Sequence, residues 1–207
     1  MTICQSTLGQ LADGDVSLER ARALSARIGV PVFPVIYAED CMAAALDERW
    51  DQVSATVAPL VAARNANMAW AEGSLLALAA RADAHLGREE EALESLARLV
   101  PWLQRSPAWG VNFIFTACHA AETLWVLDRT DHATVIEQAL LEKVIGPDFR
   151  CGMVDGRLAL GRLCAVQGRR NEARKWWAEA RQVLRSQQAV TLLAIVDRDE
   201  AAMVARG

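Results

Sequence analysis

The chain consists of long segments rich in apolar residues, with few β-branched runs and few internal glycines or prolines, separated by short polar turns. Alanine supplies much of the apolar content, and alanine loses no side-chain entropy when it enters a helix. Strands would require alternating patterns enriched in β-branched and aromatic residues. The pattern therefore predicts an all-α protein with almost no strand.

One motif recurs along the chain: an apolar helix, a short polar turn, and a second helix with a small or apolar anchor near its start. The clearest copy surrounds Gly168, a second surrounds Gly87, and two weaker copies lie around Asp128 and Glu48. The anchors of the second helices are separated by 39, 41 and 40 residues and fall at Val53, Ala92, Ala133 and Ala173. This spacing predicts a solenoid of antiparallel helical hairpins with a period of about 40 residues.

Small residues within the motif predict where the two helices of a hairpin approach each other. In the clearest copy we expect Gly161 to face Ala173 and the larger Trp177 to fill the seam toward the next hairpin. Gly87 and Gly168 stand where a helix C-terminus requires a left-handed residue.

The motif divides the chain into one helical-repeat array over residues 1–207. Residues 1–30 match the key positions only as a partial first repeat, whereas the apolar pattern near the C-terminus predicts a final capping helix. The predicted hairpins are 31–66, 67–108, 109–150 and 151–188, followed by a capping helix over 189–207.

The series Leu160, Gly161, Gly168, Ala173, Trp177 and Ala180 resembles the tetratricopeptide repeat, although the period exceeds the 34 residues of that repeat. Residues 161–184, followed by AIVDRDEAAM, also look like the C-terminal end of bacterial multidomain ATPase regulators, including those joined to cyclase or LuxR-type DNA-binding domains. The resemblance implies a regulatory module that binds a partner or senses a ligand.

The tetratricopeptide resemblance also implies a binding site on the concave face, which the first helices of the hairpins line. Arg81, Glu122 and Arg162 occupy one equivalent position in three successive hairpins. Their alternating charges predict either a ladder that binds a partner or salt bridges between repeats. The residues expected on this face are Ala77, Arg81, His85, Cys118, Glu122, Trp125, Leu158 and Arg162.

The net charge of −4 conceals an uneven distribution. Residues 150–207 carry 11 Lys or Arg and 6 Asp or Glu, so this end is basic and the remainder is acidic. The basic end could dock on an acidic surface or form a solvated helix face. Because it lacks a nucleic-acid-binding signature, we expect no direct contact with DNA or RNA.

No sequence motif indicates catalysis or a cofactor. The chain contains neither G-x-x-x-x-G-K-(S/T) nor G-x-G-x-x-G, the glycine-rich motifs that bind phosphate groups. Its histidines show no metal-binding spacing: His85, His119 and His132. Cys118 and His119 are adjacent, but neighbouring helical residues point about 100° apart and do not face each other. We therefore expect no enzyme activity, no metal and no cofactor.

Further residues carry weaker hypotheses. Asp197, Asp199 and Glu200 could bind a cation, although a solvated helix face explains them more simply. Of the adjacent Trp176 and Trp177, only one can face the hairpin core fully, which leaves the other as a candidate anchor for a partner. The five cysteines form no C-x-x-C pair, so we expect buried, reduced thiols.

The N-terminal residues lack the basic and apolar regions of a secretory signal, and the longest uncharged stretch is shorter than a membrane span. A cytoplasmic location and no membrane contact are expected. The favoured function is a protein-interaction or regulatory scaffold that binds a protein or other domains of its own polypeptide. The alternatives are a small-molecule sensor whose pocket is lined by Trp125, His85 and Arg81, and an enzyme built on Cys118 and His119.

Overall fold

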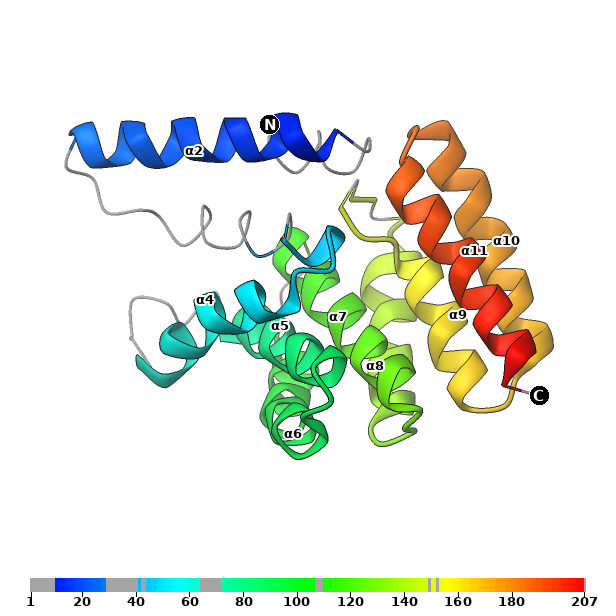
Figure 1. Ribbon diagram of the computed structural model, residues 1–207. Helices are drawn as coiled ribbons and strands as arrows, with labels where there is room; N and C mark the ends of the chain where they lie inside the picture. The colour runs from blue at the N-terminus through cyan, green and yellow to red at the C-terminus, as the bar shows by residue number, and fades with distance from the viewer. Residues whose placement is uncertain are drawn as a thin grey trace.

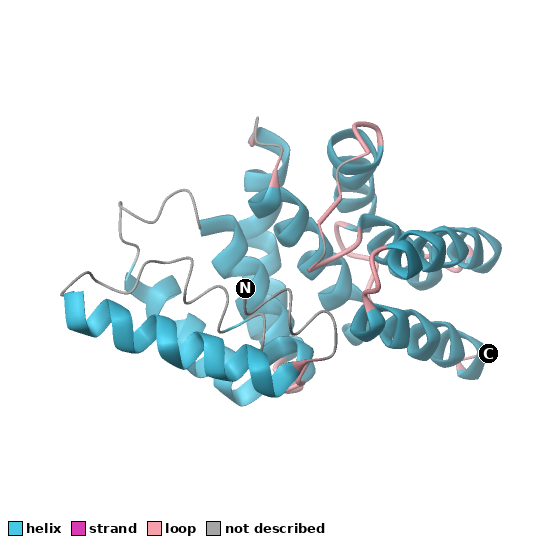
Figure 2. Cartoon of the chain, turned by 90° about the horizontal axis from the view of Figure 1, so that it is seen from above, coloured by secondary structure: helices cyan, strands magenta, loops and turns pink. Residues whose placement is uncertain are grey.

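The computed structural model describes residues 10–28, 41, 44–63, 72–106, 110–148, 150–151 and 153–206. The all-α prediction is confirmed for these residues: they form helices and turns, and the only bridge of β type is an isolated pair between Cys151 and Val154 (Figure 2). The helices are α2(Leu11–Ile28), α4(Trp50–Ala63), α5(Glu72–His85), α6(Glu89–Arg105), α7(Val111–Leu127), α8(Ala133–Leu140), α9(Gly156–Val166), α10(Arg170–Ser186) and α11(Val190–Ala205), and a π-helical turn, Leu141–Ile145, extends α8.

Helices that are close in sequence pack together. Figure 1 shows α4 to α11 following one another across the molecule, with α2 lying apart from them above α4. The main packing partners of α5 are α4, α6 and α7, and α9 packs on α7 and α10. The helix α7 is therefore central, and residues 113–125 within it are all buried.

The turn residues named from the motif adopt the left-handed backbone conformation that ends a helix. Gly87 has φ of 73° and Gly168 has φ of 76°, as predicted from their positions. Asp128 and Glu48 adopt the same conformation with φ of 53° and 56°. The anchors that follow these turns are no more than 1% exposed: Val53, Ala92, Ala133 and Ala173.

The close approach in the clearest hairpin differs from the expectation. A Cβ atom on Gly161 would overlap the indole of Trp177, whose N–H donates a hydrogen bond of 3.3 Å to the carbonyl oxygen of Leu158. Trp177 thus fills the space between α9 and α10 of its own hairpin, where an aromatic ring fits only because position 161 has no side chain. The prediction that Gly161 faces Ala173 was wrong, because the atoms nearest to position 161 belong to Trp177.

The partial first repeat predicted for residues 1–30 is represented in the described residues by the single helix α2, which continues through Gly14. Residues 190–205 form α11 at the predicted capping position. Its buried side chains pack with Trp177 in a second hydrophobic cluster: Leu192, Val196 and Met203.

Candidate functional site

Four charged side chains are buried along the inner helices α5, α7, α9 and α11. Arg81, Glu122, Arg162 and Asp199 are 5%, 5%, 4% and 2% exposed. Each lies near the middle or end of its helix, and the signs of their charges alternate from one helix to the next. Arg162 lies on α9, and Asp155 caps the N-terminus of this helix. The Asp155 carboxylate accepts hydrogen bonds of 2.9 and 3.0 Å from the backbone N–H groups of Arg157 and Leu158.

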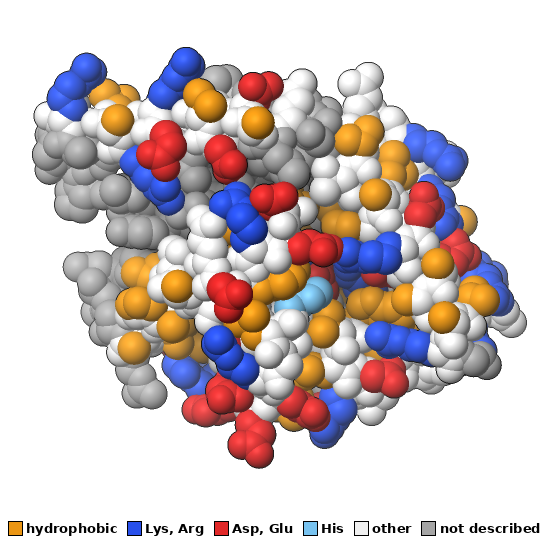
Figure 3. Space-filling model, in the orientation of Figure 1, with side chains coloured by type: hydrophobic (Ala, Val, Ile, Leu, Met, Phe, Trp, Pro, Cys, Tyr) orange, Lys and Arg blue, Asp and Glu red, His pale blue; other side chains and the backbone are white. Residues whose placement is uncertain are grey.

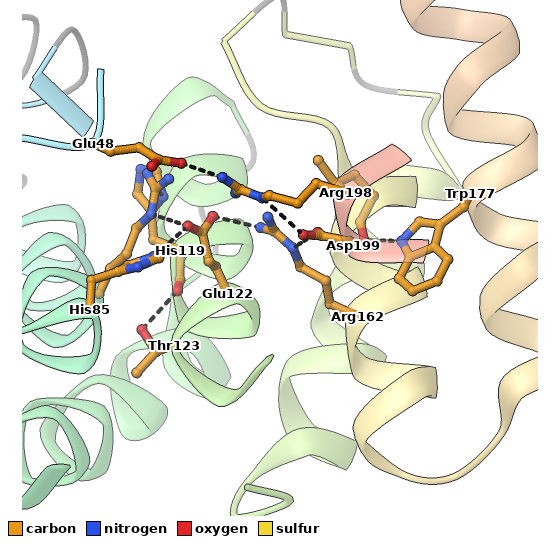
Figure 4. Close-up of polar contacts among 11 residues, drawn as sticks. Glu48, His85, His119, Glu122, Thr123, Arg162, Trp177, Arg198 and Asp199 are labelled. Atoms are coloured by element: carbon orange, nitrogen blue, oxygen red, sulfur yellow. Dashed lines mark hydrogen bonds and ion pairs between the residues drawn. The ribbon is translucent and has the colours of Figure 1, made fainter. Parts of the chain in front are cut away.

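These four residues form a continuous row of ion pairs (Figure 4). Glu122 Oε1 lies 2.7 Å from Arg81 Nε, and Glu122 Oε2 lies 2.6 Å from Arg162 Nη1. Arg162 Nε lies 2.6 Å from Asp199 Oδ2. Each buried charge therefore has an opposite partner on a neighbouring helix, as burial of a charge requires.

The electrostatics of the row favour the ionised forms of its two central residues, Glu122 and Arg162. Burial by itself would raise the pKa of Glu122, but Arg162 and Arg81 outweigh it and hold that pKa well below its usual range. Burial opposes the charge on Arg162 as well, and Asp199 and Glu122 raise its pKa above the usual value. Burial lowers the pKa of Arg81 in spite of Glu122, so it is at Glu122 and Arg162 that the opposite charges outweigh the cost of burial.

Aromatic rings cover the α5 end of the row. The ring of Trp50 stacks on His85 with centroids 3.8 Å apart, and the guanidinium of Arg81 lies 4.8 Å from the centroid of Trp50. His85 Nε2 lies 3.0 Å from Glu122 Oε1. His119 lies beside Arg81, and burial together with that guanidinium lowers its pKa to about 3, so this imidazole is neutral.

Four of the eight residues predicted for the concave face thus contact one another through their side chains: Arg81, His85, Glu122 and Arg162. Trp125 belongs instead to the second hydrophobic cluster, where its ring packs edge-on against Trp177 and under the guanidinium of Arg206. The burial of the three alternating charges favours the salt-bridge interpretation over a ladder that a partner contacts directly.

Asp199 is the member of the row that sequence reasoning placed wrongly. It was assigned to a solvated face, yet its carboxylate is buried and pairs with Arg162. The signal was present, because Asp199 follows Arg162 by 37 residues and continues the alternation of charge. The neighbouring Asp197 and Glu200 both pair with Arg181 rather than surrounding a cation position.

A small cavity of about 20 Å³ lies beside the row. That volume accommodates a water molecule but no metabolite. The row contributes Arg81, Glu122 and Arg162 to its walls, while Leu46, Leu192 and Ile195 supply apolar surface. A sensor pocket built from Trp125, His85 and Arg81 does not match this lining, since Trp125 and His85 are not part of it.

The environment of Cys118 is the opposite of what a nucleophile needs. The side chain is 5% exposed, and burial raises the pKa of its thiol well above the usual value. Reactive cysteines have a lowered pKa and partial exposure. His119, in turn, stacks on Phe115 and contacts Arg81.

The row lies under a hollow in the surface. Figure 3 shows a histidine at the floor of a depression, with hydrophobic side chains around it and basic and acidic side chains at its edges. Leu46 and Ile195 line the cavity, and Trp50, His85 and Arg198 contact members of the row; each of these five side chains is intermediate in burial or exposed. We refer to this set as the inner face.

Comparison of the chain with known protein families, with curated proteins and with solved structures gives no match. Among the described residues, no group of three or more His, Cys, Asp or Glu side chains is arranged to hold a metal ion. None of the helices in the described part of the chain combines the length and apolar character needed to cross a bilayer.

Proposed function

We propose that this chain is an interaction scaffold of the tetratricopeptide type, in which helical hairpins stack into a solenoid and the inner face binds a protein segment. The segment belongs to a partner protein or to another part of the same polypeptide. The resemblance to bacterial ATPase, cyclase and LuxR-type regulators favours a regulatory role in the cytoplasm.

The observation that carries this proposal is the buried row of charges across four inner helices. Breaking a buried ion pair by removing one partner costs about 3–5 kcal/mol, so each pair opposes a change in the spacing of the two helices it joins. The row therefore fixes α5, α7, α9 and α11 relative to one another, and with them His85, Ile195 and Arg198. A preorganised face loses less entropy when a partner binds, which increases affinity.

The composition of the inner face also suits a protein partner. Trp50 offers a partly exposed aromatic ring, Ile195 an aliphatic side chain, and Arg198 an exposed guanidinium. Aromatic and arginine side chains are enriched among the residues that dominate binding energy at protein interfaces. Binding of this kind uses side-chain contacts and needs no cofactor.

The test compares one variant on the inner face with one on the outer side of the chain. Ile195→Glu introduces a charge on the inner face, while Lys175→Glu changes an exposed position on α10. A protein recovered with the wild-type chain from the source cells is purified, and its affinity for both variants is measured. Circular dichroism establishes that both variants keep the wild-type helix content.

We expect Ile195→Glu to weaken binding at least about tenfold, which is the loss produced by a moderate interface residue, and Lys175→Glu to leave affinity unchanged. If the wild type and Ile195→Glu bind every purified partner with equal affinity, the inner face is not the binding site. Failure of any protein to bind the wild-type chain would contradict the scaffold proposal itself.

A further inference from the structure

The turn before α4 and the last helix, α11, meet across the hollow. Glu48, in the turn before α4, forms an ion pair with Arg198 of α11, although 150 residues separate them (Figure 4). Beside this contact, Leu46 lines the same cavity as Leu192 and Ile195 of α11. The turn before α4 and the capping helix together cover the row of buried charges.

This closing contact is weaker than the row below it. The side chains of Glu48 and Arg198 are 57% and 50% exposed, and ion pairs with such exposure contribute little to stability. The contact is therefore easily broken, whereas the row of buried pairs is not.

We propose that the Glu48–Arg198 contact is a latch that keeps the inner face closed. When it opens, the turn around Glu48 separates from α11, and the cavity with the row beneath it becomes accessible. This regulation rests on the proposed function, because the open state is the one that offers the inner face to a protein segment. Arg198 then contacts the partner instead of Glu48.

The thiols of this chain report such opening directly. Cys118 lines the cavity and is 5% exposed, so alkylation requires the cavity to open. Cys164 is fully buried in the second cluster, with Trp177 and Leu184, and reports unfolding of the C-terminal hairpin instead. Peptide mass spectrometry after timed treatment with iodoacetamide measures both rates in one sample.

Three variants remove the charges of this contact while keeping a polar side chain at each position: Glu48→Gln, Arg198→Gln and the double variant. The matched control is Glu89→Gln, which removes a similarly exposed ion pair with Arg129, and neither of these residues lines the cavity. We expect each single latch variant to accelerate alkylation of Cys118 by up to about fivefold. The double variant adds nothing further, because both changes break one contact.

The control variant and the Cys164 rate should remain at wild-type values. Unchanged Cys118 rates in both single variants would overturn the latch, and so would a parallel rise at Cys164, which would show that the contact stabilises the whole fold. The isolated protein suffices for this experiment, so its failure is distinguishable from failure of the scaffold proposal. With a purified partner, Glu48→Gln should bind more tightly than wild type by the factor measured at Cys118.

Discussion

Replacing Glu122 by glutamine is the most direct test of the buried row. The substitution keeps the size of the side chain and removes the negative charge that pairs with Arg81 at 2.7 Å and Arg162 at 2.6 Å. Arg162 retains Asp199, but Arg81 is left with the ring of Trp50 and the neutral His119. A buried guanidinium without a carboxylate partner is strongly unfavourable.

Loss of one partner from a buried ion pair costs about 3–5 kcal/mol, and we expect Glu122→Gln to lower the free energy of unfolding by this amount. Urea titration followed by circular dichroism measures the change. An unchanged slope of the unfolding free energy against urea concentration would show that the wild type and Glu122→Gln expose the same surface on unfolding. Glu94→Gln, at an exposed position on α6, serves as control and should change stability by less than about 0.5 kcal/mol.

A double change provides the second half of the test. Arg81→Met removes the guanidinium that Glu122→Gln leaves unpaired, so the double variant should be more stable than Glu122→Gln alone. If Glu122→Gln lowers the free energy of unfolding by less than about 1 kcal/mol, the ion pairs of Glu122 contribute no more to stability than pairs on the surface do. The row could not then be what fixes the inner helices relative to one another.

Three further predictions concern pH, packing and the turns. The pKa of His119 is lowered to about 3 in the folded protein from an ordinary 6.5, so the unfolded state binds the proton first as pH falls. As pH falls from 6.5 to 5.5, the free energy of unfolding should therefore decrease by about 1 kcal/mol, and this window lies above the pH at which Glu122 titrates in the unfolded state. The decrease should be smaller by this amount in His119→Gln, and an equal decrease in that variant would contradict the assignment. Gly161→Ala should lower stability by about 1–3 kcal/mol because its methyl group overlaps Trp177, a loss that thermal unfolding would detect and that Trp177→Leu in the same chain should partly relieve. Gly168→Ala should cost about 1–2 kcal/mol in the same assay, since φ is 76° and the position is otherwise open; a neutral effect would show that the turn can change its conformation.

The amino-acid sequence by itself determined the features that depend on neighbouring residues. Alanine-rich segments predicted the helices, and the recurring turn predicted the left-handed residues at Gly87 and Gly168. It also placed Arg81, Glu122 and Arg162 at equivalent positions with alternating charge. Helix propensity and turn chemistry act over a few residues, so they can be read directly along the chain.

The tertiary structure decided which of these residues are buried and which partners they find. Asp199 joined the row because α11 packs against α9, and Trp50 stacked on His85 because α4 packs against α5. The Glu48–Arg198 contact joins the turn before α4 to α11 and depends on how all the intervening helices pack. Small changes in the angle at each helix contact accumulate from one helix to the next, so a contact across 150 residues has no local signature in the sequence.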